Sequence, residues 1–525
     1  MPRVLAVRAL LALGTLVASA CRVPSEPASG MPEELTASTE SKLARGEQLF
    51  ATHCTACHGT LGRGDGPAAR FVFPPPRRFE AGRFRLVSSE NGAPFDRDLV
   101  ATLRRGIPGS AMPAWSWLEE EDLWALAAWV RFLAIEGLEA DLTALARRVD
   151  DPLLLAGARR IARERMTPDR ALANPAPIPT EPEALARGQS LFLEHCASCH
   201  AADGTGEPDP RADEDGTLNW ARDFTAGYLK GGDSPRELAC RIRAGMPGTA
   251  MPPTSLPRAD EADLIAFLRT LVPPGAAMRH VQSRQTLRAR RVGSLPEGPD
   301  DVVWNAADEI DVALAPLWWN ENAVQEASLA ALHDGERIAL RLSWPDASGE
   351  VRLFSESTAS DGAALQLSDS EQPALFGMGE PHRPTNLWSW RALRFEDVAG
   401  ALDLLDPRPH GIESLEPGEV RLDVPLYQRL LARIQPSERV DRITAEGVPS
   451  VPGATRFPGE VSARARWQAG AWSVVFQRTL AGGEGQVALE IGRPVQVACA
   501  LWNGAAGDQG ARKSISIWQE LVLAP

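Results

Sequence analysis

An internal repeat constrains the fold of this chain more than any other feature of its sequence. The first copy begins KLARGEQLFATHCTACHG at Lys42, and the second begins ALARGQSLFLEHCASCHA at Ala184. Each copy continues into a matching turn, RRGIPGSAMPAW or RAGMPGTAMPP, and closes on an amphipathic run over residues 120–135 or 260–272. Amphipathic runs of this length are typical of short helices. The repeat therefore predicts two small all-α domains, over residues 39–137 and 181–273.

Each copy also contains one Cys-x-x-Cys-His motif. The residues are Cys54, Cys57 and His58 in the first copy and Cys196, Cys199 and His200 in the second. This spacing is typical of covalent haem attachment, in which both thiols bond the haem and the adjacent histidine ligates its iron. A zinc site would need further Cys or His ligands, which the repeats lack. A thioredoxin-like motif would need a βαβ pattern. We therefore expect two covalent haem c groups.

A methionine lies at the same place in both matching turns and predicts the second axial ligand of each iron. These residues are Met112, in SAMP, and Met251, in TAMP. A thioether is a soft, neutral donor, and pairing it with histidine raises the potential of the iron. Met246 is a rival in the second copy, but its counterpart is Ile107, which favours a packing role.

With these motifs, residues 39–137 and 181–273 resemble mono-haem cytochrome c of the small His/Met class. Glycine in the first helix of each copy, Gly46 or Gly188, permits close approach of another helix. Trp129 and Phe267 in the last helices are the candidates for that contact. His53 and its counterpart in the second copy are too close to the attachment cysteines to reach the opposite haem face. We expect both histidines at the surface or near the haem propionates.

The N-terminus has the pattern of a signal peptide over residues 1–20. Two arginines precede a short apolar run that ends in small residues. The sequence VASAC resembles a bacterial lipoprotein signal, which implies lipidation of Cys21; the alternative is cleavage near Ala20 with Cys21 as a plain thiol. Residues 21–38 then form a linker. We expect a periplasmic or cell-envelope protein, with membrane contact only through a lipid anchor at Cys21.

The net charge narrows the choice of partners. The chain carries a formal charge of −14, whereas binding to nucleic acid needs a basic face. After residue 20, no stretch is apolar for long enough to form a transmembrane helix. The charge therefore argues against nucleic acid and favours a soluble body.

The second half of the chain has a different pattern. A linker over residues 138–180 begins with a polar helical stretch and ends in the proline-rich run NPAPIPTEPEA, and residues 274–297 form another linker. From residue 298, short alternating apolar runs such as RIALRLSW and GAWSVVFQRTL are separated by Gly, Pro and Asp turns. This pattern predicts an all-β sandwich over residues 298–525.

Three stretches of this β region carry a resemblance. They are LRLSWPDAS, ALFGMGEPHRPTNLWSWRA and ALWNGAAGDQGARKSISIWQELVL. They resemble the haem-binding domain of the γ-subunits of ethylbenzene dehydrogenase and dimethylsulfide dehydrogenase. The resemblance implies one non-covalent haem b, held between Met378 and Lys513. The ordinary alternatives are a core methionine and a solvated lysine, with His333, His382 and His410 as other ligand candidates.

Composition agrees with an unusual role for Lys513. The chain has 55 basic residues, of which only Lys42, Lys230 and Lys513 are lysines. An arginine cannot be deprotonated in a protein, whereas a lysine amine can become a neutral donor. Burial and a nearby metal both favour that neutral form.

The resemblance implies electron transfer without a catalytic site in this chain. A γ-like cytochrome subunit would pass electrons between a periplasmic molybdopterin and iron–sulfur oxidoreductase of the dimethylsulfoxide reductase family and a redox partner of the respiratory chain. No catalytic triad or nucleotide-binding loop stands out. The main alternative is a stand-alone dihaem carrier whose β-sandwich is a docking module. An enzyme acting at an open haem is disfavoured by the three candidate methionine ligands.

Overall fold

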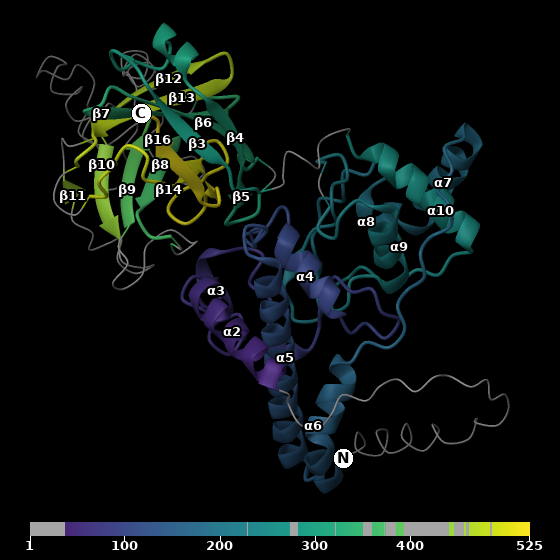
Figure 1. Cartoon of the computed structure of the whole chain (residues 1–525). Helices are drawn as coiled ribbons and strands as arrows, with labels where there is room; N and C mark the ends of the chain where they lie inside the picture. Colours follow the sequence, from purple (N-terminus) through teal and green to yellow (C-terminus); the bar gives the residue numbers. More distant parts are fainter. Residues whose placement is uncertain are drawn as a thin grey trace, which may run out of the picture. The chain divides into compact units, whose positions relative to one another are not determined.

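The structure is a computed structural model of the whole chain (Figure 1). It describes the following residues: 37–227, 229–273, 282–320, 322–349, 360–371, 373, 385–392, 440–445, 456–457, 461–482 and 486–525. The signal-peptide residues, Cys21 and Met378 lie outside this part of the chain. Within it, no helix is both long and apolar enough to cross a membrane.

The first copy of the repeat folds into helices. They are α2 (Ala37–His53), α3 (Thr55–His58), α4 (Asp96–Arg105) and α5 (Glu120–Val149), with short 3-10 turns at Ala69–Phe71 and Phe79–Ala81. A side chain at Gly46 of α2 would overlap the Ala125 carbonyl of α5 and approach Cβ of Trp129 at 2.9 Å. Because only glycine fits there, the predicted close contact between the first and last helices is confirmed.

The second copy repeats this arrangement. Its helices are α7 (Pro182–His195), α8 (Ala197–His200), α9 (Pro235–Ala244) and α10 (Arg258–Leu271), and a two-stranded hairpin pairs β1 (Arg211–Ala212) with β2 (Leu218–Asn219). A side chain at Gly188 would overlap the Asp263 carbonyl of α10 and approach Cβ of Phe267 at 2.9 Å. The two copies thus share one helix crossing, with glycine at the same position.

Helix α5 extends well past residue 137, the boundary expected from the repeat. It runs without interruption to Val149 and is followed by α6 (Pro152–Met166). Leu138 and Leu142 of α5 pack on Ala158 and Ala162 of α6. The first part of the expected linker is therefore a packed helical hairpin, because its apolar residues recur at helical spacing.

The C-terminal region forms a large β-sheet. Its strands are β3 (Thr286–Arg291), β4 (Glu309–Ala313), β5 (Ala315–Pro316), β6 (Glu326–His333), β7 (Arg337–Pro345), β8 (Gly362–Ser368), β9 (Thr385–Arg391), β10 (Val440–Ala445), β11 (Arg456–Phe457), β12 (Ser462–Gln468), β13 (Ala471–Thr479), β14 (Val495–Trp502), β15 (Ser514–Ile515) and β16 (Gln519–Leu523). The main strand order is β11-β10-β9-β8-β14-β16-β3-β6-β7-β13-β12. Most pairs are antiparallel, but β3 runs parallel to both β16 and β6.

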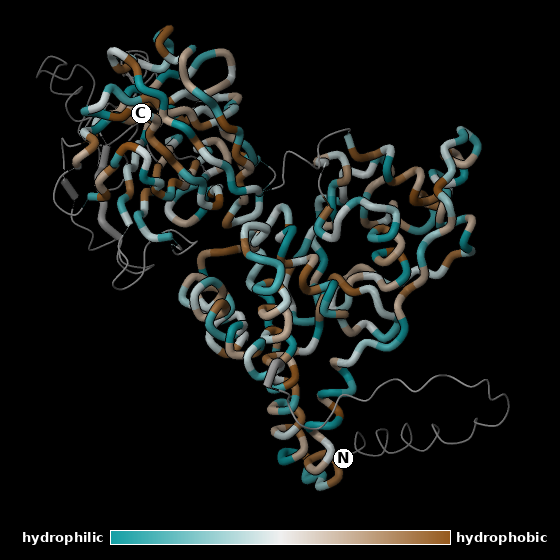
Figure 2. The backbone as a smooth tube through the Cα atoms, in the orientation of Figure 1, coloured by the Kyte–Doolittle hydropathy of each residue, from teal (hydrophilic) through white to brown (hydrophobic). Residues whose placement is uncertain are grey.

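The core of this sheet combines many aliphatic side chains with five large aromatic ones. Trp344, Trp388, Trp390, Trp472 and Phe476 have at most 1% of their surface exposed. Buried and less buried residues alternate along much of β7, β9 and β13, as expected for strands with one covered face. Figure 2 shows how hydrophobic and hydrophilic residues follow one another along the chain. Burial of these rings supplies much of the driving force for folding this region.

Candidate functional site

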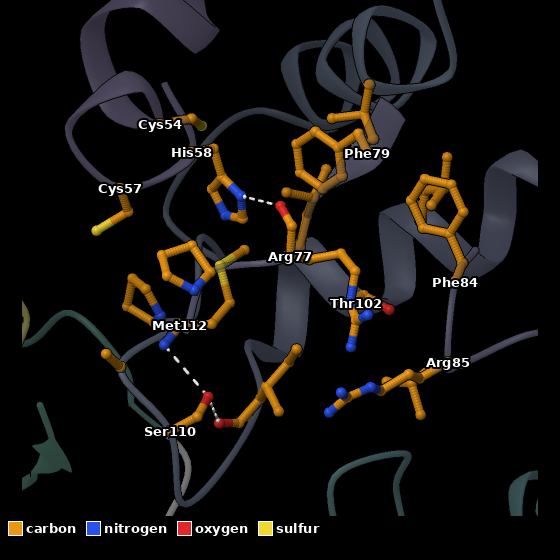
Figure 3. A pocket seen from close by; sticks show the side chains of 18 of the residues that line it. Cys54, Cys57, His58, Arg77, Phe79, Phe84, Arg85, Thr102, Ser110 and Met112 are labelled. Carbon is orange, nitrogen blue, oxygen red and sulfur yellow. Dashed lines mark hydrogen bonds between the residues drawn. The ribbon is translucent and has the colours of Figure 1, made fainter. Parts of the chain in front are cut away.

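The first repeat encloses an apolar cavity with about 1400 Å³ of free space, including its open mouth. Cys54, Cys57, His58 and Met112 all line it (Figure 3). Apolar side chains such as Phe50 complete the wall. Large apolar cavities with a few convergent polar groups are typical of cofactor sites.

The attachment motif forms one tight turn. The amides of Cys57 and His58 both donate to the Cys54 carbonyl, at 3.2 and 2.9 Å. These bonds make the four residues of α3 a single helical turn, and Cys54, Cys57 and His58 all line the cavity. The turn thus brings together the three side chains that covalent haem attachment uses.

The His58 ring is held by a backbone group. Its Nδ1 lies 3.0 Å from the Arg77 carbonyl, and a carbonyl can only accept a hydrogen bond, so Nδ1 donates. Nε2 is then left as the acceptor nitrogen that can bind a metal. The Phe79 ring stacks on the imidazole at 4.6 Å. Burial lowers the pKa of His58 to about 4, so the ring is neutral at neutral pH.

A hydrogen-bonded loop presents Met112 to the same cavity. The Ile107 amide donates to the Met112 carbonyl at 3.0 Å, and the Met112 amide donates to Ser110 Oγ at 3.3 Å. Gly106 begins the loop with φ 68°, and a side chain there would lie 2.6 Å from Pro113. Figure 3 shows the Met112 side chain pointing into the cavity that His58 faces.

The second repeat has the same frame. His200 Nδ1 donates to the Arg222 carbonyl at 3.0 Å, and Phe224 stacks on the imidazole at 4.6 Å. The Met246 amide donates to the Met251 carbonyl at 3.1 Å, as Ile107 does to Met112. The same backbone hydrogen bonds therefore hold the motif histidine and the methionine loop in both repeats.

The residues that hold the histidines carry a signal in the sequence that motif reasoning missed. An Arg-x-Phe triplet occurs at Arg77–Phe79 and again at Arg222–Phe224. In each triplet the arginine carbonyl accepts a hydrogen bond from the histidine, and the phenylalanine ring stacks on the imidazole. Comparing the two copies beyond the Cys-x-x-Cys-His motif would have found both residues.

The structure separates the two alternatives expected for His53. It is not at the surface, since only 5% of it is exposed; it lines the cavity, and its ring packs against Trp115 and Trp117 at 5.2 and 5.4 Å. Met246, for which a packing role was expected, lines the cavity of the first repeat. The contact of His53 with the two indole rings joins residues far apart in sequence, so spacing does not reveal it.

The β region places Lys513 in a half-buried position just before β15. Its Nζ lies 5.0 Å from the centre of the Trp502 ring, and the Arg391 guanidinium lies 4.3 Å from the same ring. Burial, followed by repulsion from Arg391, lowers the pKa of Lys513 to about 8. The surroundings thus make the neutral amine more accessible than it is for a lysine in water.

The other ligand candidates of the β region differ in position. Met378, His382 and His410 lie outside the described residues. His333 is fully buried in β6, and its Nε2 lies 2.8 Å from the Ala524 carbonyl. That contact ties His333 to the C-terminal end of the chain.

The two helical repeats belong to the cytochrome c class. The family described as cytochrome c oxidase, cbb3-type, subunit III matches residues 41–130, and the family described as cytochrome c matches residues 185–272. The family described as ethylbenzene dehydrogenase matches residues 431–514. The chain therefore combines two cytochrome c domains, which imply covalent haem c, with a domain like the γ-subunit of ethylbenzene dehydrogenase.

Two curated relatives match about half of the chain. A protein of Haloferax mediterranei described as a respiratory nitrate reductase haem subunit is 23% identical over 271 residues, covering 50% of this chain and 80% of the relative. The dimethylsulfide dehydrogenase subunit gamma of Rhodovulum sulfidophilum is 24% identical over 240 residues, covering 42% and 73%. A solved chain from a reducing HAO-like protein complex of Kuenenia stuttgartiensis is 25% identical and covers 46% of this chain and all of its own, with a TM-score of 0.38.

Proposed function

We propose that this chain is an electron-transfer cytochrome subunit of an oxidoreductase complex. The observation that carries the proposal is the duplicated frame, in which a carbonyl-held histidine and a loop methionine are presented by each of two cytochrome c domains. Both relatives are named as subunits of respiratory or dehydrogenase enzymes.

Two haem c groups occupy the domains at residues 39–137 and 181–273 in this proposal. In the first, Cys54 and Cys57 hold the haem covalently, and His58 and Met112 are the axial ligands. The second domain uses the equivalent set: Cys196, Cys199, His200 and Met251. Haem supplies the one-electron chemistry, while these residues set ligation and burial. A neutral imidazole and a thioether add no charge to the iron, so both centres favour the reduced state relative to anionic ligation.

A third haem, of type b, binds in the β region. We assign its ligands as Met378 and Lys513. The β region is a sandwich that was expected over residues 298–525, but it begins earlier, because β3 (Thr286–Arg291) lies within the expected linker and pairs with β16 and β6. The lowered pKa of Lys513 supports the assignment, because only a neutral amine has a free electron pair. The hydrophobic core draws on strands from both ends of the main strand path, such as β7 and β9, which is consistent with two packed layers.

The partner is a molybdopterin and iron–sulfur oxidoreductase of the dimethylsulfoxide reductase family. Haem held at the three sites would supply one-electron chemistry between the partner's clusters and the respiratory chain, and no bond would be made or broken in this chain. In this proposal the protein resides in the periplasm or cell envelope with a lipid anchor at Cys21, which the apolar N-terminal run and the small residues before Cys21 support.

Haem content tests this proposal most directly. A pyridine haemochrome spectrum of the purified full chain should give haem c and haem b in a ratio of two to one. Haem c alone would contradict the γ-like assignment and leave a dihaem carrier with a β docking module.

A matched pair of variants tests the ligand in the β region. Lys513→Arg keeps a long basic side chain but cannot supply a neutral amine, so we expect loss of the haem b signal with both haem c groups retained. Arg512→Lys, at the neighbouring exposed residue, should keep all three. Equal haem b in both variants would exclude Lys513 as a ligand.

A further inference from the structure

The cavity of the first cytochrome domain is lined by cations from both cytochrome domains. Arg77 and Arg85 belong to the first domain, and Lys230 reaches the cavity from the loop between β2 and α9 of the second. All three are half-buried. The electron-transfer proposal assigns no role to Lys230.

Hydrogen bonds hold this loop against the first domain. Arg105 Nε of α4 donates to the Lys230 carbonyl at 3.2 Å, and Arg105 Nη1 pairs with Glu237 at 3.2 Å. In the other direction, Arg241 of α9 donates to the Arg85 carbonyl at 2.6 Å and also to the Val87 carbonyl. Hydrogen bonds donated by each domain to the other therefore hold the segment around Lys230 beside the first cavity.

Three cations, Arg77, Arg85 and Lys230, lie near two carboxylates, Asp213 and Asp215, so positive charge is in excess. Asp213 pairs with Arg85 and accepts from Asn219 at 2.6 Å. Among the residues that the structure describes, no carboxylate lies within ion-pair distance of Arg77 or Lys230, and Arg85 Nε is buried without a hydrogen-bond partner. Burial lowers the pKa of Arg77 to about 10. It also lowers the pKa of Lys230 to about 7, with added repulsion from Arg222 and Arg85.

An excess of buried positive charge is costly unless an anion neutralises it. A haem carries two propionate carboxylates, so a haem bonded to Cys54 and Cys57 would supply the missing negative charge. Arginine and lysine are the side chains suited to carboxylate groups. The cation excess and the apolar cavity beside it therefore fit the same cofactor.

Lys230 also borders a second cavity, of about 1110 Å³ of free space including its mouth. That cavity is lined by Arg222, whose carbonyl holds His200, and by Trp220. Lys230 thus borders both cavities: the one that His58 lines, and the one lined by Arg222, whose carbonyl holds His200.

We propose that Lys230 is an interdomain positioning residue that pairs with a haem propionate in the first cavity and adds its charge to the field at both haem c centres. The inference rests on the haem c part of the proposed function and not on the partner enzyme. Its consequence is that the second domain helps to set the potential of the first.

Redox titration of the full-length holoprotein tests this role. Reduction adds a negative charge, so removing a nearby cation lowers the potential. We expect Lys230→Met to make reduction of the first haem about tenfold less favourable, which is a fall of about 59 mV for one electron. The second haem should change in the same direction by less. Arg269→Met, which removes an exposed cation of α10, should leave both potentials unchanged.

Asp213→Asn gives an independent test of opposite sign. Removing the carboxylate beside Arg85 should raise the potential of the first haem, and Lys230→Arg should leave it close to that of the native protein. Potentials of Lys230→Met equal to those of Arg269→Met would overturn the inference, as would an unchanged potential in Asp213→Asn. Absence of haem c from the native protein would instead refute the proposed function itself.

Discussion

The two cytochrome c domains have the same ligand frame in different surroundings. Both hold a histidine through a backbone carbonyl and a phenylalanine ring at 4.6 Å. In the first domain Cys54 and Cys57 are buried, whereas Cys196 and Cys199 are half-exposed. Solvent exposure and nearby charge tune haem potentials at constant ligation. The comparison therefore teaches that the repeat duplicates the binding chemistry and leaves the environment free to diverge.

The largest effect should come from removing one histidine at a time. His58→Ala or His200→Ala deletes an iron ligand, so we expect each variant to lose one of two low-spin haem c signals, as measured by electron paramagnetic resonance of the oxidised protein. His195→Gln is the control, because it changes an exposed residue next to the motif. Loss of both signals in either variant would show that the domains do not bind haem independently.

Truncating the stacked phenylalanine rings should lower the stability of the two domains by different amounts. Phe79 is 8% exposed and Phe224 is less buried. We expect Phe79→Ala to cost about 3–5 kcal/mol of local stability and Phe224→Ala less, since the cost follows the buried surface lost. Hydrogen exchange of peptides from α2 and α7 measures each domain separately. Equal losses would contradict the difference in burial.

Adding a methyl group at the helix crossing should lower the stability of both domains by similar amounts. Gly46→Ala and Gly188→Ala each place a methyl group against a carbonyl of the facing helix, so we expect each to lose about 1–3 kcal/mol of stability. Gly157→Ala in α6 is the control, because the added methyl group would lie 3.5 Å from its nearest neighbouring atom. Unchanged hydrogen exchange in Gly46→Ala would refute the close contact.

The smallest effect concerns the residue after each motif. Gly59 has φ 71° and ψ 164°, and Ala201 has φ 56° and ψ 164°. Only glycine adopts this conformation without strain, so Ala201→Gly should stabilise the second domain by about 1 kcal/mol. Gly59→Ala should destabilise the first, because its methyl group would also overlap Asp65. Denaturant unfolding followed at the haem absorption band measures both, and destabilisation by Ala201→Gly would contradict the strain.

Much of this fold could be predicted from the sequence because its signals are local. The Cys-x-x-Cys-His spacing, the Met112 and Met251 turns and the Gly46 crossing all follow from short motifs that occur twice. The contacts of Lys230 and Asp213 could not be predicted, because residues far apart in sequence meet across two domains without any periodic pattern. The composition did contain one hint: Lys230 is one of only three lysines.

The carbonyl that holds each histidine has a consequence for how such a protein can evolve. Since Arg77 and Arg222 accept through the main chain, replacing either side chain alters the local charge without removing the bond to the imidazole. Positioning of the histidine and electrostatic tuning therefore depend on separate atoms of one residue. Substitution of either arginine can therefore change the redox potential of the nearby centre while the residues that would ligate its iron stay the same.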